Sequence, residues 1–516
     1  MESPGLSTDD LNSSLDCYTN GLPMSPSSKT GSFATKIFRD PVHGQIELHP
    51  ACVAIIDTPE FQRLRYVKQT GCLEYVYPGA IHNRFGHSLG VCYLAGKFLQ
   101  ELREHQPELQ LSDTDVLCVE LAGLCHDLGH GPYSHTWESF MKTSNCQRNV
   151  KTAWKHEMVS ANMLDYLIEE NNLFPILKEF GIGYEEIELI KNYIMGTQPS
   201  NENKAFLYQI VNNDDSGLDV DKWDYFLRDC FFLGLPCSFE YERIMQFAKV
   251  FVVDGKAEIC YRDKILESVY NVFRTRSNLH RLAYQHKIVT IVEKMFIDAF
   301  LLADGKITGP NGEVLFLWEW SMAAAFSRGE QLKNALKQFS LLTDSFVHNC
   351  IKHSTKPELR KAAGLITAVE RRSCKNSGFY RHVGLKILSH HYEESEILSN
   401  LCQFLPLGNK MVLNFYGDLT QGNSDEVTAD DICVCVVPVN WGKGNRNPVD
   451  FVHFYSKHLG VIKNAMNVQE VSALLPKTFE EIQVHVLCRR TDEFAFRVAR
   501  FCFEKLWVDA ANSSQL

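Results

Sequence analysis

The sequence has no Cys-x-x-Cys pair, no long apolar run, and no N-terminal basic segment followed by an apolar one. The first absence argues against a zinc ribbon, although 17 cysteines are scattered along the chain. The other two argue against a membrane-spanning helix, which needs roughly 18 apolar residues or more, and against a secretion signal. We therefore expect a soluble, reduced, intracellular protein that resides in the nucleus, the cytoplasm or both.

Positive charge is also scarce. The 516 residues include 52 Lys and Arg against 63 Asp and Glu, so the net charge is −11. Broad nucleic-acid binding depends on neutralising phosphates and is therefore disfavoured, whereas a local basic pocket for one polyphosphate is not excluded. The hydrophobic fraction of 45% is ample for a large core. At about 150 residues per domain, the length suggests roughly three units, or one large helical domain with additions.

The most informative stretch is residues 121–135, where His126 and Asp127 stand side by side at the end of an apolar run. The apolar residues before them recur at helical spacing, and glycines and a proline then end the predicted helix. An isolated His-Asp pair is more often a core histidine beside a capping aspartate. Because His130 and His135 follow within ten residues, the pattern favours a site for a divalent transition metal.

Two other stretches contain residues that could complete this metal site. His87 lies at the front of a predicted helix that runs to about residue 104, with Arg84 one turn earlier. Residues 217–229 interleave aspartates with aromatic residues, which fits the wall of a pocket better than a plain surface helix; Asp219 suits an N-cap, and Asp221 lies in the first turn. Together these residues form a split H…HD…D pattern.

The remaining chain predicts a largely helical protein with a smaller α+β lobe at its C-terminal end. We expect the segment 1–33 to be a disordered tail, 34–383 the helical part and 384–516 the lobe. We expect helices at 59–69, 134–142, 155–172, 184–196, 204–212, 266–303, within 315–371, near 467–475 and at 491–506, and strands at 257–261, 411–416, 432–437, 451–455 and 482–487.

These motifs resemble the HD superfamily of metal-dependent phosphohydrolases, and most closely the vertebrate deoxynucleoside triphosphate triphosphohydrolases that combine SAM and HD domains. The resemblance runs from about Lys36 to about Lys505 and includes Asp-Pro-Val-His-Gly, His-Asn-Arg-Phe-x-His-Ser-Leu-Gly, Leu-Cys-His-Asp-Leu-Gly-His-Gly-Pro, Asp-Val-Asp-Lys-Trp-Asp-Tyr and Ala-Tyr-Gln-His-Lys. The roughly 35 residues before it are too few for a SAM domain, so we expect none.

The resemblance implies a mostly α-helical HD-domain core and a phosphoric ester hydrolase. The implied ligands of a divalent metal (zinc, iron, manganese or magnesium) are His87, His126, Asp127 and Asp221. A water activated at the metal would attack the α-phosphorus of a dNTP and release the deoxynucleoside with intact inorganic triphosphate. All four dNTPs are expected substrates, because the family holds the base loosely.

The resemblance also implies roles around the metal. The implied catalytic residues are His130, His135, His156 and Glu138. His135 is the candidate general acid, and Glu138, in place of the family's aspartate, would orient it. The implied substrate contacts are Arg84, Lys222 and Arg276 with the phosphates, Gln69, Tyr225, Asp229 and Tyr284 around the sugar, and Gln285 beside the base.

Finally, the resemblance implies allosteric activation and a homotetramer. The implied GTP or dGTP site contains Lys36, Ile37, Asp57, Gln62 and Arg65. The implied dNTP site, between subunits, contains Arg39, Val76, Arg243, Arg262, Lys264 and Arg372. Arg39 and Ser268 replace family asparagines there, and residues 373–380 contain an insertion, so regulation is where this chain departs most. The family also implies dNTP catabolism, antiviral defence and innate immunity.

Two other interpretations remain open. An HD nucleotidase or phosphodiesterase would cleave other phosphate esters and release orthophosphate instead of triphosphate. A nucleic-acid-binding scaffold, with weak affinity for single strands, would have catalysis as a secondary role, although the net charge of −11 opposes strong binding.

Overall fold

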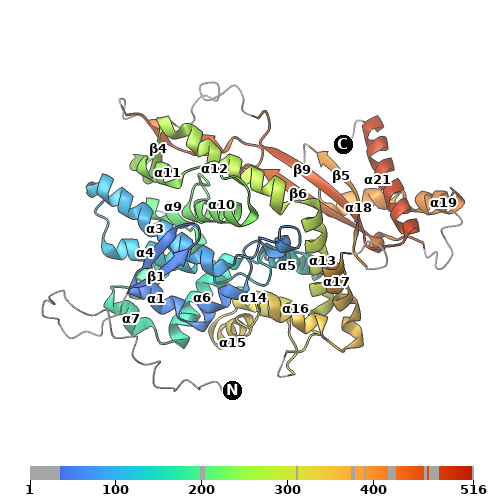
Figure 1. Ribbon diagram of the computed structural model, residues 1–516, viewed down its shortest axis with the longest axis horizontal. Coiled ribbons are helices and arrows are strands. Elements are labelled where there is room, and N and C mark those ends of the chain that lie inside the picture. Colours follow the sequence, from blue (N-terminus) through green and yellow to red (C-terminus); the bar gives the residue numbers. More distant parts are fainter. Residues whose placement is uncertain are drawn as a thin grey trace, which may run out of the picture.

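The computed structural model describes residues 35–197, 204–309, 312–372, 378–388, 391–415, 426–457, 462–463 and 476–513 (Figure 1). Three sequence predictions lie wholly or mostly outside these ranges and are not addressed by them. They are the tail at 1–33, the helix near 467–475 and most of the insertion at 373–380.

Helices build most of the protein, as predicted, and surround α3 and α10 (Figure 1). Those of the N-terminal half are α1 (Pro50–Ile56), α2 (Pro59–Gln62), α3 (Arg84–His105), α4 (Asp113–Cys125), α5 (His135–Gln147), α6 (His156–Glu170), α7 (Phe174–Glu179), α8 (Tyr184–Met195), α9 (Tyr208–Val211), α10 (Val220–Leu233) and α11 (Tyr241–Gln246). Those that follow are α12 (Leu266–Leu279), α13 (Lys287–Ala303), α14 (Leu317–Phe326), α15 (Gly329–Phe339), α16 (Asp344–Lys352), α17 (Arg360–Arg371), α18 (Glu394–Cys402), α19 (Leu405–Phe415) and α21 (Glu493–Ser513).

Two helices that position the predicted metal ligands begin with side-chain caps. They are α4, which ends just before His126 and Asp127, and α10, which contains Asp221. In α4, Ser112 accepts a hydrogen bond from the backbone of Asp115, whose carboxylate accepts one from the Ser112 backbone in return. In α10, Asp219 is the N-cap and accepts from the backbone of Lys222, which confirms its predicted position. Both caps fix where the following side chains point, because they fix the first turn of each helix.

The strands form three sheets. β1 (Lys36–Asp40) pairs with β2 (Gly44–Leu48), and β3 (Ala248–Val253), β4 (Lys256–Arg262), β7 (Phe454–Tyr455) and β8 (Ile462–Lys463) form a four-stranded sheet. β5 (Arg381–Leu388), β9 (Glu480–Cys488) and β6 (Ile432–Asn440) form an antiparallel sheet, against which α18 and α21 lie, while α19 packs on α21 (Figure 1). This last group is the predicted α+β lobe. β5 runs across residues 383 and 384, where the domain boundary was predicted, and that boundary stays a prediction.

Several element predictions are confirmed and one is wrong. The strands at 257–261, 432–437 and 482–487 and the helix at 491–506 are present. Residues 411–415 are not a strand but the end of α19. A short apolar run does not distinguish a buried strand from a helix. In α19, Leu405 and Val412 stand seven residues apart and enter the same core, which is helical spacing.

Three further elements are shorter than predicted. The helix at 59–69 is α2 followed by a 3-10 turn, because the chain must then extend to pair with residues near 83. The helix at 204–212 is a 3-10 turn and the single-turn α9, and the strand at 451–455 is only β7. The helix at 266–303 is interrupted by a π-helical segment, His280–Tyr284, after which His286 caps α13.

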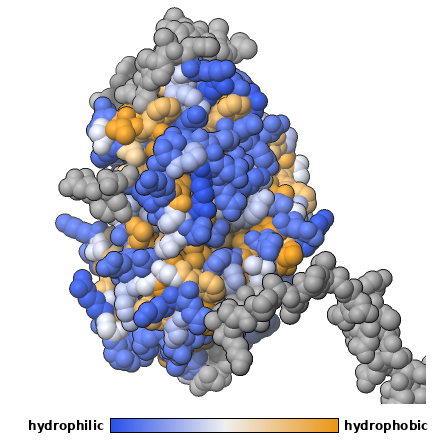
Figure 2. All heavy atoms as spheres, turned by 90° about the vertical axis from the view of Figure 1, so that its left-hand side faces the viewer, coloured by the Kyte–Doolittle hydropathy of each residue, from blue (hydrophilic) through white to orange (hydrophobic). Residues whose placement is uncertain are grey.

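A large hydrophobic core joins the helices, and a second core lies between the antiparallel sheet and α18, α19 and α21. The face at the left of Figure 1 is mostly hydrophilic, with scattered apolar patches (Figure 2). None of the helices in the described part of the chain combines the length and the apolar character needed to cross a membrane.

The crossing of α3 and α10 leaves no room at Gly90. A Cβ there would overlap the Asp224 carboxylate and come within 2.6 Å of the Arg228 guanidinium. We therefore expect Gly90→Ala to lower the free energy of unfolding by about 1–3 kcal/mol, as overpacking usually does. Thermal and urea unfolding followed by circular dichroism would measure the change.

Gly364→Ala is the matched control, because Gly364 also lies inside a helix, α17, but has no other group within 4 Å of the position that a Cβ would take. Alanine there should leave stability unchanged or raise it by up to about 1 kcal/mol, since it reduces the freedom of the unfolded chain. Equal effects at both glycines would contradict the packing argument.

Candidate active site

Four side chains from three helices converge on one point. His87 comes from the first turn of α3, His126 and Asp127 follow the end of α4, and Asp221 lies in the first turn of α10. The Nε2 atom of His126 lies 3.2 Å from that of His87, 3.4 Å from Asp221 Oδ1 and 3.3 Å from Asp127 Oδ1. Ligands at about 2.1 Å from one ion and at right angles to each other are about 3 Å apart, so this spacing suits a shared metal.

The hydrogen bonds of the two histidines support the same conclusion. His126 Nδ1 donates to the carbonyl oxygen of Gly123 at 2.7 Å, and His87 Nδ1 lies 2.7 Å from Asp224 Oδ2. In the neutral form with the proton on Nδ1, which is the form that binds a metal, each imidazole would direct the lone pair of Nε2 toward the other ring, and the two lone pairs would repel each other. A cation between the two nitrogens would remove this repulsion, and the fixed Nδ1 partners are typical of metal-ligating histidines. Two imidazoles with two carboxylates suit zinc, iron or manganese.

The surrounding carboxylates make this point favourable for positive charge. Burial alone would lower the pKa of His87, but Asp221, Asp224 and Asp127 together raise it to about 9. Burial would raise the pKa of Asp127, yet Arg84, His126 and His130 hold it well below its usual range. The site therefore keeps its carboxylates ionised despite nearly complete burial.

A second group of possible metal donors adjoins the first. Donor atoms of Asp127, His130 and His156 lie within 4.8 Å of one another. The rings of His130 and His156 stack at 3.8 Å between centroids. Asp127 thus belongs to both groups and could serve one ion or bridge two.

The carboxylate of Glu138 contacts both His156 and His135. It lies 2.6 Å from His156 Nδ1 and 3.2 Å from His135 Nδ1. Burial opposes charge on His156, but Glu138 outweighs it and raises the pKa to about 9. The histidines in turn hold the pKa of Glu138 well below its usual range, although burial would raise it. His156 and Glu138 are therefore an ion pair, whereas His135, with its side chain 69% exposed, is free to approach a substrate.

The turn before α5 explains how His135 is presented. Tyr133 and Ser134 both have positive φ, of 58° and 52°, which costs energy for residues other than glycine. Surrounding hydrogen bonds hold the turn: the Tyr133 backbone donates to Asp344, and the Ser134 hydroxyl donates to the backbone of Lys68 and accepts from Arg84. The strained turn brings His135 to the cavity beside the metal group.

That cavity has a volume of about 720 Å³. Every predicted substrate contact lines it: Gln69, Arg84, Lys222, Tyr225, Asp229, Arg276, Tyr284 and Gln285. The π-helical segment between α12 and α13 ends at Tyr284, and so it places Tyr284 and Gln285 at the wall. The structure thus brings these residues together with the metal group, while their individual roles remain predictions.

The polar residues of the cavity differ in how firmly they are held. The Arg84 guanidinium donates to Asp127 at 2.8 Å, while Arg276 Nε is buried without a hydrogen-bond partner in the described structure. Asp229 is fixed from two sides, by His82 Nε2 at 2.6 Å and by the donating hydroxyl of Tyr284. Arg276 is therefore the cation most available to a new anion, and Asp229 is a rigid acceptor.

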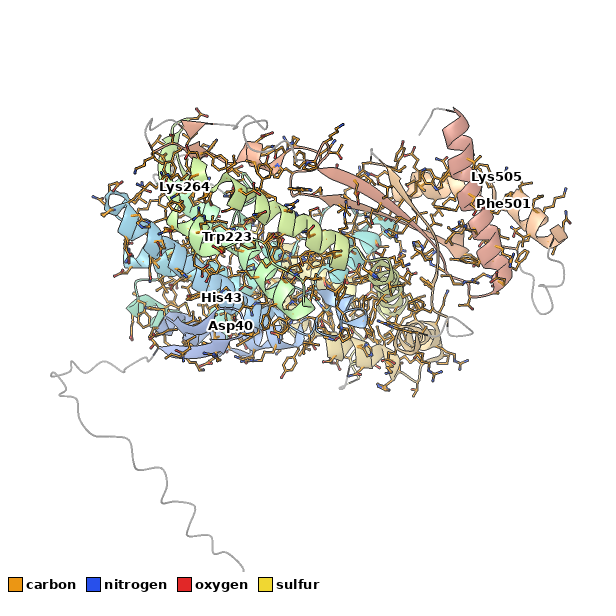
Figure 3. The ribbon with its side chains drawn as sticks, turned by 45° about the horizontal axis from the view of Figure 1, so that its top comes forward. Asp40, His43, Trp223, Lys264, Phe501 and Lys505 are labelled. Atoms are coloured by element: carbon orange, nitrogen blue, oxygen red, sulfur yellow. The ribbon has the colours of Figure 1, made fainter. Side chains whose placement is uncertain are left out.

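Sequence reasoning missed the residues that support the metal ligands. Asp224 contacts His87, His43 and Arg228 at 2.6–2.8 Å, and Arg228 also donates to Asp40 at 2.8 Å. Asp40 and His43 lie side by side near the β1–β2 turn (Figure 3). Asp40 and His43 belong to the Asp-Pro-Val-His-Gly motif, and Asp224 is one of several aspartates in residues 217–229. The three-residue step from Asp221 to Asp224 was the available signal.

The residues predicted for a GTP site meet on one part of the surface. Lys36 Nζ lies 2.9 Å from Asp57 Oδ1. Gln62 donates to the backbone oxygen of Ile56 at 2.7 Å and accepts from Arg65 Nε at 2.7 Å. The fifth residue, Ile37, is 62% exposed. The chain therefore assembles these residues by itself, without a partner subunit.

The residues predicted for a dNTP site do not all meet. Arg243, Arg262 and Lys264 surround the Phe247 ring, with their charged atoms 5.5, 5.8 and 3.6 Å from its centroid. Arg372 ends α17, on the other side of the molecule from α11 and Lys264 (Figures 1 and 3). Arg39 lies in β1, and Val76 follows a 3-10 turn. One chain thus supplies separate parts of this predicted site.

Comparisons with known proteins agree with this geometry. The HD domain model matches residues 84–228, which include all four predicted metal ligands. The deoxynucleoside triphosphate triphosphohydrolase SAMHD1 of Xenopus laevis is 40% identical over 493 residues, which cover 91% of this chain and 73% of that protein. Human SAMHD1 is 39% identical over 497 residues, covering 92% and 74%. The SAMHD1 homolog of Dictyostelium discoideum is 32% identical over 460 residues, covering 89% and 78%. Since the similarity includes the metal ligands and about three quarters of each relative, the chain belongs to the SAMHD1 family of HD-domain deoxynucleoside triphosphate triphosphohydrolases.

Proposed function

We propose that the protein hydrolyses dNTPs at the α-phosphorus and releases a deoxynucleoside and intact inorganic triphosphate. The observation that carries the proposal is the convergence of His87, His126, Asp127 and Asp221 beside a cavity that is also lined by cationic and aromatic side chains. The activity for which the relatives are named supports the same substrate class.

The residues around that point have different proposed roles. A divalent metal held by the four ligands would supply positive charge that polarises a phosphate ester and acidifies water. Arg84, Lys222 and Arg276 bind the phosphate oxygens and stabilise the charge that develops during transfer. Because Arg84 already donates to Asp127, it also fixes the carboxylate that faces the metal.

His135 acts as the general acid in this scheme. As water oxygen bonds to the α-phosphorus and the bond to the 5′ oxygen breaks, His135 gives its proton to that oxygen, so that a neutral deoxynucleoside leaves. Glu138 accepts hydrogen bonds from His135 and His156 and thereby orients both rings. His156 stays positively charged beside it and adds to the field that favours phosphate.

The sugar lies, in this proposal, against Tyr225, Tyr284 and Asp229. The rings of Tyr225 and Tyr284 face the cavity, and Asp229 is held rigidly as an acceptor. A tyrosine packed against C2′ leaves no room for a 2′-hydroxyl, which gives a steric reason to prefer deoxynucleotides.

Regulation is proposed to follow the family pattern. GTP or dGTP would bind where Lys36, Asp57, Gln62 and Arg65 meet, and a dNTP would bind at Arg243, Arg262 and Lys264 with residues of a neighbouring subunit in a homotetramer. The separation of Arg372 from the other three in one chain supports a site that needs two subunits.

The first test is product analysis with dGTP and Mg²⁺ or Mn²⁺, with and without GTP. We expect equimolar deoxyguanosine and inorganic triphosphate, measured by liquid chromatography. Asp127→Ala and His126→Ala should reduce the rate at least a thousandfold and lower the bound metal, measured by mass spectrometry of the elements, because each removes a ligand.

Asp165→Asn is the control, since Asp165 pairs with Lys191 on the surface and is not one of the residues that line the cavity. It should keep both metal and activity. Release of orthophosphate or a monophosphate would instead support the nucleotidase alternative. A folded, metal-loaded protein that yields no product with any dNTP would overturn the proposal.

Replacing Glu138 by glutamine should lower kcat by about 10–100-fold and leave KM within a few fold. The amide cannot stabilise charged His156, nor accept equally well from His135, so acid catalysis is weakened while phosphate contacts remain. Steady-state kinetics would measure the changes in kcat and KM separately. A purely higher KM would contradict the assigned role.

Replacing Asp57 by asparagine should raise the GTP concentration needed for half-maximal activation at least tenfold. The carboxylate loses its charge and its ion pair with Lys36, while the catalytic cavity is untouched. Titration of GTP against a fixed dATP concentration would measure the shift. An unchanged midpoint would place the activator elsewhere.

A further inference from the structure

Other residues line the same cavity besides those assigned to the phosphates and sugar. They include Val289 and Glu293 of α13 and Thr136 of α5. Val289 and Glu293 are one helical turn apart, so they lie on the same face of α13. Glu293 thus adds to the cavity wall a carboxyl group that no assigned role uses.

Glu293 has few partners of its own. Its one hydrogen bond within the described structure comes from the Thr136 hydroxyl at 3.5 Å, which is long. The next residue, Lys294, pairs with Asp298 at 3.1 Å and so does not neutralise Glu293. Burial raises the pKa of Glu293 to about 7, and Thr136 offsets this only in part. A carboxyl in this state gains from any ligand that brings hydrogen-bond donors.

Polar atoms in the neighbouring part of the cavity wall also lack hydrogen-bond partners in the described structure. The hydroxyl of Thr70 is buried and has no hydrogen-bond partner in the described structure, and the Oε1 atom of Gln69 is also unsatisfied there. Cys72, on the 3-10 turn that follows Thr70, is close enough for the charge of Glu293 to raise the pKa of its thiol further, although burial is the larger cause. Unpaired polar atoms therefore lie along the wall that leads from Gln69 to Glu293.

The proposed placement of the substrate decides what meets Glu293. A dNTP whose α-phosphate lies at the metal ligands has its triphosphate at the cations, its sugar between the tyrosines and its base beside Gln285. In this placement the base is the part of the substrate left to meet Val289 and Glu293, which line the same cavity. The base is also the one part that carries N–H donors.

We propose that Glu293 recognises the edge of the base and favours guanine. The inference rests on the proposed function, because it requires a dNTP in this cavity. A carboxylate offers two acceptor oxygens side by side, and guanine alone presents two adjacent donors, N1–H and the 2-amino group.

The other bases match less well. Adenine and cytosine each place one amino donor beside a ring acceptor, so only one hydrogen bond forms. Thymine places its N3–H between two carbonyl oxygens, which the carboxylate repels. The expected order of kcat/KM is therefore dGTP first, dATP and dCTP next, and dTTP last.

A competition assay isolates this contact. Equimolar dGTP and dITP, which lacks only the 2-amino group, are mixed with saturating GTP, and initial formation of deoxyguanosine and deoxyinosine is measured. The product ratio gives the ratio of kcat/KM directly, and both substrates share one regulatory state and one protein preparation. We expect a ratio on the order of tenfold or more for the natural chain, as for loss of a hydrogen bond to a charged group.

Glu293→Gln should bring that ratio to within about threefold. The carboxylate has two acceptor oxygens, whereas the amide has one acceptor oxygen and an NH2 group, which would face the 2-amino donor of guanine. Glu394→Gln is the matched control: Glu394 also lines the cavity, from α18, but its carboxylate accepts from the backbone of Val436 at 3.0 Å. It should keep the natural ratio.

The outcomes separate the two proposals. No hydrolysis of either nucleotide by the natural chain would reject the proposed function. Hydrolysis with a ratio near one would reject base recognition by Glu293 and leave the function standing. A ratio that Glu293→Gln leaves unchanged, while both rates fall together, would show that Glu293 only supports the structure.

Discussion

The buried carboxylate of Asp224 is the group on which the site depends. It contacts His87, a predicted metal ligand on α3, and also His43 and Arg228. Arg228 in turn donates to Asp40, so the β1–β2 turn, α3 and α10 meet at one charge. A charge with no exposure is stable only when it is paired and hydrogen-bonded from several sides, and Asp224 is. The orientation of His87 therefore depends on three segments that are far apart in the sequence.

The same balance between burial and charge governs the rest of the cavity. Asp127 remains ionised because Arg84 and two histidines face it, and Glu138 because His135 and His156 do. Each of these carboxylates serves at least two partners, so removing one partner leaves a buried charge that the others must compensate. A chain with an excess of acidic residues can therefore still offer cations to a polyphosphate. Arg84, Lys222 and Arg276 line the cavity, where low polarity strengthens their effect.

The sequence indicated which residues would be predicted as metal ligands, because His126 and Asp127 follow a periodic apolar helix and His87 and Asp221 open two others, and the structure brings these four together. It could not show that Asp224 holds His87, since that contact joins residues 137 positions apart. It also missed the π-helical segment, which contains no glycine or proline to mark it and yet places Tyr284 at the cavity. The wrong strand at 411–416 has a simpler cause. Its short apolar run fits either element until the packing of α19 is known.

The two regions predicted to bind regulatory nucleotides differ in how their side chains are paired within one chain. Lys36 forms an ion pair with Asp57, and Gln62 accepts a hydrogen bond from Arg65. Arg243, Arg262 and Lys264 instead gather like charges around one ring, and none forms an ion pair with a residue of the described structure. Desolvation, together with Arg262 and Arg243, lowers the pKa of Lys264, which is the direction that mutual repulsion gives. An anion placed among these three cations would relieve that repulsion. A polyphosphate bound there would therefore stabilise the arrangement of α11, β4 and the turn after β4 that keeps the three cations together.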